Sequence, residues 1–390
     1  MKKVLVVGCG LSGAVVAREL VNEYANVSIE IWERRNHIAG NMYDFVDPNG
    51  ILVQKYGPHT FHTKKKYLFD YICQYGEWKE FFLTCRAEIF GIQTPSPFNF
   101  KSVDDFFCED EAFKIKQAFK SLYNGQRTIS VVQALKSNEN NIRRFAEFLF
   151  ENDYKLYSAK QWGCLPEEID PSILERVPIR LSYDDGYFDD PFQVMPKTNY
   201  VDFFKNLLNH PRIKVILNKN ALDYLRFRNN YIVADNNQFD LVVFTGALDE
   251  LFDCKYGRLP YRSLRFEWKY SDIDSFQDAP VVAYPQEKGY TRITEYKKLP
   301  VQNVKGTTYA IEYSLPYTKG EYMEPYYPIL SEKSDQLYKK YKNEAGVIEN
   351  LVYCGRLADF KYFNMDQALD NALAVAHSDK ISKILGKTEK

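Results

Sequence analysis

The sequence predicts an α/β fold with three parts: a nucleotide-binding domain built on parallel strands, an inserted helical bundle, and an antiparallel sheet domain. Three observations predict it. The first 40 residues run as strand, glycine-rich turn, helix and strand. Apolar residues then recur at helical spacing through 67–161, and they alternate as in strands from residue 261 onward.

The opening element is an apolar strand at 3–7, which leads through a glycine-rich turn into a helix at 14–24. A second strand at 27–32 ends at Glu33 and completes a βαβ unit. Further along, we expect a helix at 201–209, then short strands at 214–217, 231–234 and 241–245. Antiparallel strands are expected at 261–269, 279–284 and 307–313. A strand at 351–354 and a helix from 365 to about 385 predict that the C-terminus folds back onto the first domain.

Composition and charge exclude several classes of protein. The 390 residues carry 51 basic and 52 acidic side chains, which gives no global attraction for nucleic acid or an anionic membrane. No apolar run approaches the roughly 20 residues of a membrane span. Seven scattered cysteines without a CxxC pair indicate a reducing compartment. We therefore expect a cytoplasmic protein without nucleic-acid or membrane partners.

The glycine-rich turn has the spacing of a dinucleotide-binding fingerprint. Gly8, Gly10 and Gly13 form GxGxxG between a strand and a helix, and Glu33 follows about 20 residues later. The glycines allow close backbone approach to a pyrophosphate at the helix N-terminus, and the carboxylate suits the ribose hydroxyls. The sequence thus predicts a Rossmann-like domain.

The turn after Glu33 resembles that of FAD-binding oxidoreductases. It runs Arg34-Arg35-Asn36-His37-Ile38-Ala39-Gly40-Asn41. Thr245-Gly246 and Gly355-Arg356 match two further places where such proteins contact FAD. Three dispersed contacts favour FAD over NAD as the cofactor.

Several strings, taken in order along the chain, resemble the UDP-galactopyranose mutase family. They are Gly57-Pro58-His59-Thr60-Phe61-His62-Thr63, Lys160-Gln161-Trp162-Gly163, Arg176-Val177-Pro178-Ile179-Arg180, Tyr261-Arg262-Ser263-Leu264-Arg265-Phe266-Glu267, Tyr290-Thr291-Arg292-Ile293, Pro325-Tyr326-Tyr327-Pro328 and Gly355-Arg356-Leu357 with Tyr362. The resemblance implies a three-part fold with the active site in the cleft between the parts. The expected division is FAD domain at 1–75, 201–255 and 336–390, helical bundle at 76–165, mobile loop and start of the sheet domain at 166–200, and antiparallel sheet at 256–335.

The resemblance also implies roles for individual residues. The expected FAD contacts are Gly8, Gly10, Gly13, Glu33, Arg34, Gly40, Asn41, His59, Gly246, Arg356 and Met365. Arg176 and Arg292 are the expected diphosphate-binding arginines, and guanidinium forks suit that charge. The other expected substrate contacts are Tyr154, Tyr157, Trp162, Tyr187, Arg262, Tyr327, Tyr362 and Asn364. His62 is expected near the flavin and the sugar; because no further ligand lies near His59 and His62, we reject a metal site.

The implied reaction interconverts UDP-galactopyranose and UDP-galactofuranose. In it, N5 of reduced FAD attacks the anomeric carbon, UDP departs transiently, and the sugar recloses through another oxygen. NAD(P)H or another reductant would keep the flavin reduced, and a homodimer is expected.

Three departures from the family pattern concern the substrate. Asn364 stands where an Asp is usual, Ala283-Tyr284-Pro285 replaces Asn-Tyr-Thr, and Ala39 replaces a glycine. The first two leave dTDP-fucopyranose and UDP-N-acetylgalactosamine open as alternative substrates. An amine-oxidase-like FAD oxidoreductase is the alternative class, and a catalytically inactive nucleotide-sugar-binding protein is a third.

Overall fold

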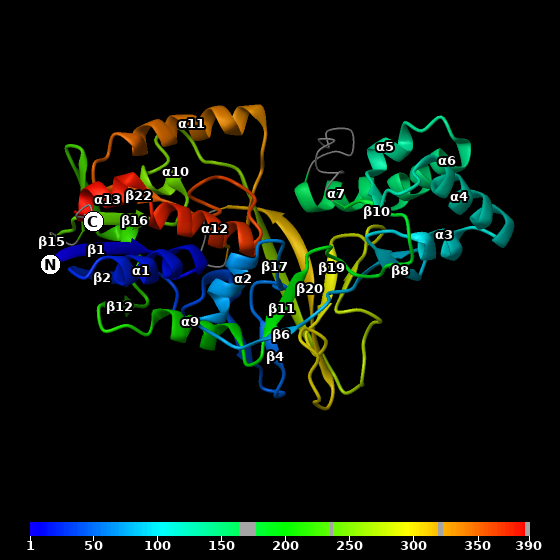
Figure 1. Cartoon of the computed structure of the whole chain (residues 1–390), viewed down its shortest axis with the longest axis horizontal. Helices are drawn as coiled ribbons and strands as arrows, with labels where there is room; N and C mark the ends of the chain where they lie inside the picture. The colour runs from blue at the N-terminus through cyan, green and yellow to red at the C-terminus, as the bar shows by residue number, and fades with distance from the viewer. Residues whose placement is uncertain (164–176, 235–236, 319–322, 387–390) are drawn as a thin grey trace.

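A parallel sheet forms the centre of the nucleotide-binding part of the molecule in this computed structural model, which describes residues 1–163, 177–234, 237–318 and 323–386 (Figure 1). Within those residues its strands pair in the order β12 (Ile213–Ile216), β2 (Val27–Trp32), β1 (Lys2–Val7), β16 (Leu241–Phe244) and β22 (Leu351–Tyr353). The last strand of the chain therefore lies in the same sheet as the first. The predicted α/β class with a Rossmann-like sheet is confirmed.

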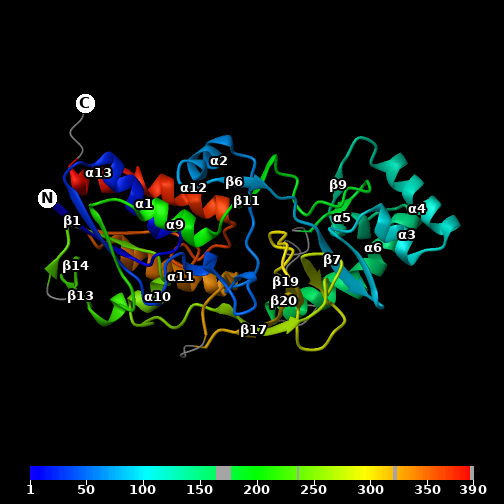
Figure 2. The same cartoon turned by 90° about the horizontal axis from the view of Figure 1, so that it is seen from below.

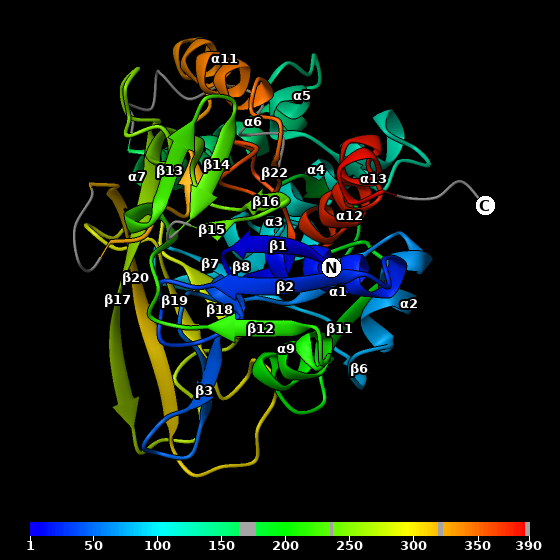
Figure 3. The ribbon, with the colours of Figure 1, turned by 90° about the vertical axis from the view of Figure 1, so that its left-hand side faces the viewer.

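Both faces of this sheet are covered, which explains why the central strand β16 and the second half of β1 are continuous apolar runs. Val4 and Val6 are fully buried against one face, where α1 (Leu11–Glu23), α9 (Tyr200–Leu208), α12 (Met365–Ala376) and α13 (Asp379–Leu385) pack. Leu5 is buried on the other face, beneath α10 (Leu248–Leu251) and α11 (Glu332–Gly346) and the small sheet of β13 (Leu225–Arg228), β14 (Tyr231–Ala234) and β15 (Asn237–Gln238). Figure 3 shows the two layers on either side of the strands.

The C-terminal helix is divided, where the sequence predicts one helix from 365 to about 385. Helix α12 ends at Ala376, and α13 starts at Asp379. Ser378 between them has extended backbone angles, which a continuous helix does not allow.

A second, larger sheet forms the middle of the molecule. Within the described residues its order is β21 (Tyr327–Pro328), β17 (Tyr261–Ser271), β20 (Thr307–Pro316), β19 (Arg292–Glu295), β18 (Val281–Ala283), β7 (Cys85–Ile89) and β8 (Ile92–Ser96). Its pairs are antiparallel except for β18 with β7, which is parallel. The sheet is therefore mixed, and two of its strands come from the segment that the sequence predicts to be helical.

Strand β7 could have been found by its alternating pattern, whereas β8 has no such pattern. Cys85, Ala87 and Ile89 are buried while Arg86 and Glu88 are half-buried, which is the period of two that a strand requires. Phe90 and Gly91 both have positive φ and close the turn between the two strands.

The helical part lies at the end of the molecule farthest from the parallel sheet (Figure 2). Its elements are α3 (Phe100–Phe106), α4 (Glu109–Leu122), α5 (Val131–Leu135), α6 (Asn140–Leu149), the π-helix η2 (Phe150–Tyr154) and α7 (Lys155–Trp162), with β9 (Thr128–Ile129) paired to β10 (Ile179–Arg180). Phe119, Phe145 and Leu149 are fully buried at its centre.

Short elements connect the parts. Strand β11 (Phe192–Pro196) lies between β5 (Phe61–Thr63) and β6 (Trp78–Glu80), so it does not join the large sheet as the sequence-based division of 166–200 implies. Helix α2 (Lys66–Cys73) follows β5, and β3 (Asp44–Val46) pairs with β4 (Leu52–Gln54). Two 3₁₀ turns, η1 (Gly40–Met42) and η4 (Ala221–Asp223), complete these connections. No helix among the described residues is long and apolar enough to cross a membrane.

Asn350 provides a test of this architecture, because its buried amide joins β22 to the neighbouring sheet. It accepts from Ile232 N at 2.9 Å and donates to Ile232 O at 2.9 Å and Phe239 O at 3.1 Å. We expect Asn350→Ala to lower the free energy of unfolding by about 3 kcal/mol, because buried backbone groups lose their partners. Urea unfolding measures this, with exposed Asn138→Ala as the control; equal midpoints for the two variants would contradict it.

Candidate functional site

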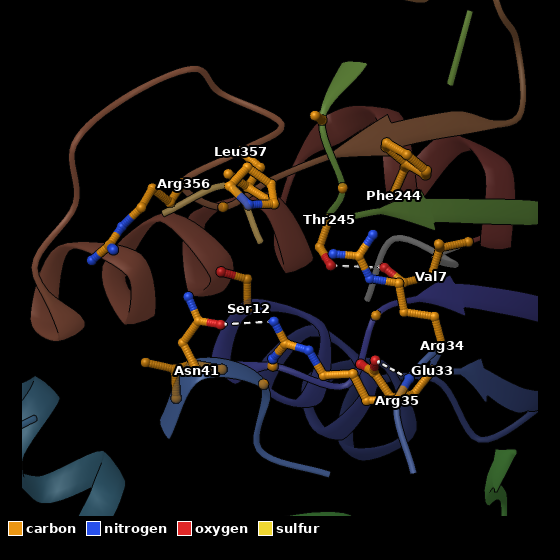
Figure 4. A pocket seen from close by; sticks show the side chains of 18 of the residues that line it. Val7, Ser12, Glu33, Arg34, Arg35, Asn41, Phe244, Thr245, Arg356 and Leu357 are labelled. Carbon is orange, nitrogen blue, oxygen red and sulfur yellow. Dashed lines mark hydrogen bonds between the residues drawn. The ribbon is translucent and has the colours of Figure 1, made fainter. Parts of the chain in front are cut away.

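A pocket opens at the carboxyl ends of β1, β2 and β16, where open α/β sheets bind ligands (Figure 4). Among its lining residues are Gly8, Gly10, Glu33, Arg34, Gly40, Asn41, His59, Gly246, Arg356 and Met365. These are ten of the eleven residues that the sequence assigns to the cofactor. The remaining one, Gly13, lies behind the turn.

The glycines are required by close backbone contacts. A Cβ on Gly13 would lie 2.1 Å from the Gly8 carbonyl oxygen, and one on Gly40 would lie 2.8 Å from Gly10 Cα. Gly8 itself has φ +99°. Ala39, where the resemblance leads one to expect glycine, also takes a left-handed conformation at φ +75°. The result is a narrow backbone cradle at the N-terminus of α1, as a pyrophosphate needs.

Glu33 borders the cradle with its carboxylate held in place. The side chain is buried and accepts from Cys9 N at 2.8 Å and Arg35 N at 2.9 Å, one amide on each oxygen. A carboxylate oxygen can accept a second hydrogen bond, so the group can still take a ribose hydroxyl.

Sequence reasoning missed Arg35 and Glu324, which organise the wall of the pocket beside Arg34. The Glu324 carboxylate pairs with Arg34 and also with Arg35 at 3.2 Å. Arg35 donates to Asn41 Oδ1 at 3.0 Å and lies 4.3 Å from the centre of the Tyr56 ring. These two arginines lower the pKa of Glu324 against the effect of its burial. Arg35 and Glu324 are separated by 289 residues, so no local sequence motif could indicate that they form a pair.

Lys219 is a second lining residue that the sequence did not single out. Its ammonium lies 3.5 Å from the centre of the Trp32 ring and 4.6 Å from that of Tyr224. The pocket thus runs from this aromatic end, past the cradle, to His59 and Arg356. The phosphate cradle between its two ends fits a dinucleotide.

Arg292 carries the positive charge beside the far end of the pocket. Its Nε and a terminal nitrogen contact Glu312 Oε2 at 2.9 and 2.8 Å, across the β19–β20 pair. Burial disfavours the charged guanidinium, but Glu312, with Tyr157 and Tyr327, acts against burial, and the pKa of Arg292 is raised well above its ordinary value. The guanidinium therefore stays charged, and one carboxylate oxygen fixes its orientation.

Aromatic side chains gather around this charge. The Tyr327 and Tyr362 rings stack with their centres 5.4 Å apart, and the Arg356 guanidinium carbon lies 5.4 and 5.3 Å from those two centres. Burial raises the pKa of Tyr157, and the nearby Arg292 opposes that rise. Tyr187 lies edge-on to Phe188 with ring centres 4.8 Å apart. It is close enough to Tyr157 to contribute to the raised pKa of that residue. Cation and hydroxyl groups thus meet at one junction.

His59 belongs to the same junction. Burial lowers its pKa to about 4, and the charges of Arg356 and Arg292 act in the same direction. Its Nδ1 lies 2.8 Å from Gly57 O, which holds the ring in place. His59 is therefore neutral near pH 7.

Two predicted residues, Tyr154 and His62, have other contacts in the structure. Tyr154 is buried in the helical core, and its hydroxyl donates to Val177 O at 2.8 Å, so it is not available to stack on a base. His62 does not line the pocket: it is stacked on Phe188 with ring centres 3.5 Å apart and lies 2.8 Å from Asp190 Oδ2. The pocket histidine is His59.

Arg262 supports the site rather than lining the pocket. It is buried and donates to Gln161 O at 3.1 Å, Lys160 O at 3.3 Å and Ser314 Oγ at 3.1 Å. It thereby holds the C-terminal end of α7, where half-buried Trp162 is the last residue.

Two other predicted residues complete the set. Asn364 lines the cofactor pocket at the start of α12, and its backbone N–H donates to Gln367 Oε1 at 2.9 Å. Arg176 lies outside the described residues. Among those residues, no group of three His, Cys, Asp or Glu side chains is arranged to hold a metal ion.

Glu312 provides a test of the site's electrostatics. Its side chain is 1% exposed and bears Arg292 as its counterion. We expect Glu312→Ala to lower the free energy of unfolding by about 3 kcal/mol, because it leaves a largely buried guanidinium without its partner. Chemical denaturation measures this, and Glu267→Ala on β17, which removes an exposed carboxylate, is the control. A Glu312→Ala protein as stable as the control would show that Arg292 is solvated without Glu312.

Comparison with known proteins places this geometry in a family. Residues 152–362 match the family model described as UDP-galactopyranose mutase, and residues 6–75 match that of an NAD(P)-binding Rossmann-like domain. The dTDP-fucopyranose mutase of Escherichia coli is 35% identical over 96% of this chain and 98% of its own. The UDP-galactopyranose mutase of Mycoplasma genitalium is 34% identical over 94% of this chain and 92% of its own.

Solved structures support the fold. The crystal structure of reduced UDP-galactopyranose mutase superimposes with a TM-score of 0.67 at 15% identity, covering 100% of this chain and 97% of the other. Putrescine oxidase with bound putrescine gives 0.53 at 12% identity, covering 98% and 99%. At such identities the likeness concerns the fold alone. The sequence relatives go further: the chain belongs to the UDP-galactopyranose mutase family of nucleotide-sugar pyranose–furanose mutases.

Proposed function

We propose that this protein binds FAD and, with the flavin reduced, interconverts UDP-galactopyranose and UDP-galactofuranose. The observation that carries the proposal is Arg292, a permanently charged guanidinium fixed by Glu312 beside the far end of a dinucleotide pocket and ringed by tyrosines. A nucleotide diphosphate is the doubly negative ligand that such a group suits.

The fit of FAD rests on the pocket. The backbone cradle at Gly10 and Gly40 accepts a pyrophosphate, Glu33 accepts ribose hydroxyls, and the segments around His59, Arg356 and Met365 would border the isoalloxazine. When bound and reduced, the flavin supplies the nucleophile for a ring contraction that involves no net oxidation.

The protein's own residues orient the substrate and hold the leaving group. Arg292 neutralises the diphosphate, and the Tyr327 and Tyr362 hydroxyls can donate to its oxygens. Tyr157 offers a ring face to the uracil. Neutral His59 can exchange hydrogen bonds without adding charge beside the flavin. Retaining the diphosphate in place favours return to the sugar over loss to water.

dTDP-fucopyranose is the second candidate substrate. A relative named for that reaction is 35% identical over nearly the whole chain, a degree of similarity comparable to that of the UDP-galactopyranose mutases. Asn364, at the far end of the pocket, both donates and accepts hydrogen bonds, so it would select a different hydroxyl pattern from a carboxylate. Dithionite-reduced protein assayed against UDP- and dTDP-sugars distinguishes the two. No isomerisation of any sugar, with net oxidation of an amine instead, would overturn the proposal.

Arg292→Ala tests the diphosphate contact. We expect kcat/KM to fall by about 100-fold or more, because the leaving group loses its counter-charge, while FAD stays bound since Arg292 does not line the cofactor pocket. The control is Arg265→Ala, which removes an exposed arginine from β17. Turnover and flavin absorbance are measured on the same preparations. Near-normal turnover of Arg292→Ala would remove Arg292 from the mechanism.

A further inference from the structure

Lys160 makes an unusual set of contacts for a lysine on a helix. Its ammonium donates to three backbone carbonyls of one loop: Tyr284 O, Glu287 O at 2.8 Å and Tyr290 O at 2.9 Å. An ammonium has three N–H donors, so this loop takes all of them. The loop connects β18 to β19 and leads directly to Arg292.

The side chain of Gln286, at the tip of the loop, makes further contacts: its Oε1 accepts from Phe90 N at 2.8 Å and its Nε2 donates to Asn152 Oδ1 at 3.4 Å. Residues 286–289 are exposed, and Gly289 has φ +95°. The hairpin is closed at its base by Tyr284 N donating to Thr291 O at 2.9 Å. Lys160 binds three backbone carbonyls on the inner side of the loop. It is therefore positioned to stabilise the loop's conformation.

The helix that carries Lys160 also carries Tyr157, one turn earlier on a neighbouring position of the surface. The C-terminal end of α7 is separately fixed by Arg262 and by Ser314 Oγ, which donates to Gln161 O at 2.7 Å. Lys160 adds the contact to the β18–β19 loop, so α7 is held to the large sheet at two points. Figure 1 shows α7 at the end of the helical part that faces this sheet.

The charge of Lys160 is held at a cost. Burial lowers its pKa to about 8, although Glu287 and Asp153 favour the charged form. Burial raises the pKa of Asp153, on η2, to about 7. Tyr284 and Tyr290 are titratable groups of the loop itself, and Glu88 of β7 and Tyr313 of β20 face it from the neighbouring strands. A lysine in solvent would avoid this desolvation cost. Here the hydrogen bonds to the three carbonyls offset the cost of keeping the ammonium charged.

From these contacts we propose that Lys160 is a positioning residue: by tying α7 to the β18–β19 loop, it sets the spacing between Tyr157 and Arg292, and hence between the base and diphosphate subsites. This inference rests on the proposed function. Tyr157 lies three residues before Lys160 on the same helix, and Arg292 lies two residues after Tyr290, whose carbonyl Lys160 binds. Lys160 is therefore only a few residues along the chain from Tyr157, and its contact on the loop is only a few residues from Arg292. Neither Lys160 nor the loop touches the cofactor pocket.

A ligand that spans both subsites should depend on Lys160, whereas its separate halves should not. We expect Lys160→Met to raise the dissociation constant of UDP about 10-fold and to leave binding of uridine and of inorganic diphosphate unchanged, all by titration calorimetry. Lys160→Arg, which can still donate to carbonyls, should restore most of the affinity. Lys155→Met is the matched control, because this lysine lies on the same helix and pairs only with exposed Glu151 among the described side chains. Flavin content should be the same in all four proteins.

The unmodified protein provides an independent measurement. UDP affinity should fall as pH rises through about 8, where Lys160 loses a proton and a donor, and the fall should be absent in Lys160→Arg. Unchanged UDP affinity in Lys160→Met, or an equal loss for uridine alone, would overturn the inference. If Lys160→Met does not fold, a flat pH profile of the unmodified protein would overturn it. Because binding is measured without turnover, UDP binding without isomerisation would contradict only the proposed reaction.

Discussion

The ion pair between Arg292 and Glu312 is the interaction on which the site depends. It lies on two adjacent strands of the large sheet, so the sheet's register determines where the guanidinium points. Burying a charge costs free energy, and the contact with Glu312 offsets that cost for Arg292. Glu312 contacts the Nε and one terminal nitrogen, which leaves other guanidinium N–H groups for a ligand. The fold thus holds a largely buried cation with tyrosines around it, as the proposed diphosphate contact requires.

The parts of this site that could be predicted from sequence are those encoded locally. The cradle of Gly8, Gly10 and Gly13 with Glu33 lies within one βαβ unit, where spacing alone fixes the geometry. The same holds for β17, whose alternating residues indicate a strand over nearly its whole length. The ordered motifs also named Arg292, Tyr157, Tyr327 and Tyr362 as substrate contacts, and the structure brings these side chains near one another.

Other features depend on contacts that no local pattern contains. Glu324 reaches Arg35 across most of the chain, and β7 joins β18 in a parallel pair across nearly 200 residues. The surroundings of the two histidines also required the structure: His62 lies on β5, opposite Gln193 of β11, while His59, which the sequence assigns to the cofactor, precedes that strand and lines the pocket. Likewise, Tyr154 lies in the π-helix η2, whose irregular turn places it in the core, while Tyr157 reaches the junction.

The place of β22 at the edge of the parallel sheet bears on how the protein is made. The strand comes from residues 351–353, and Gly355 and Arg356 just beyond it border the cofactor pocket. During synthesis, β16 keeps an unpaired edge until residues 351–353 are available to pair with it, and one wall of the pocket is missing for as long. A chain shortened before this strand would carry an open sheet edge and would lack Gly355 and Arg356 at the pocket.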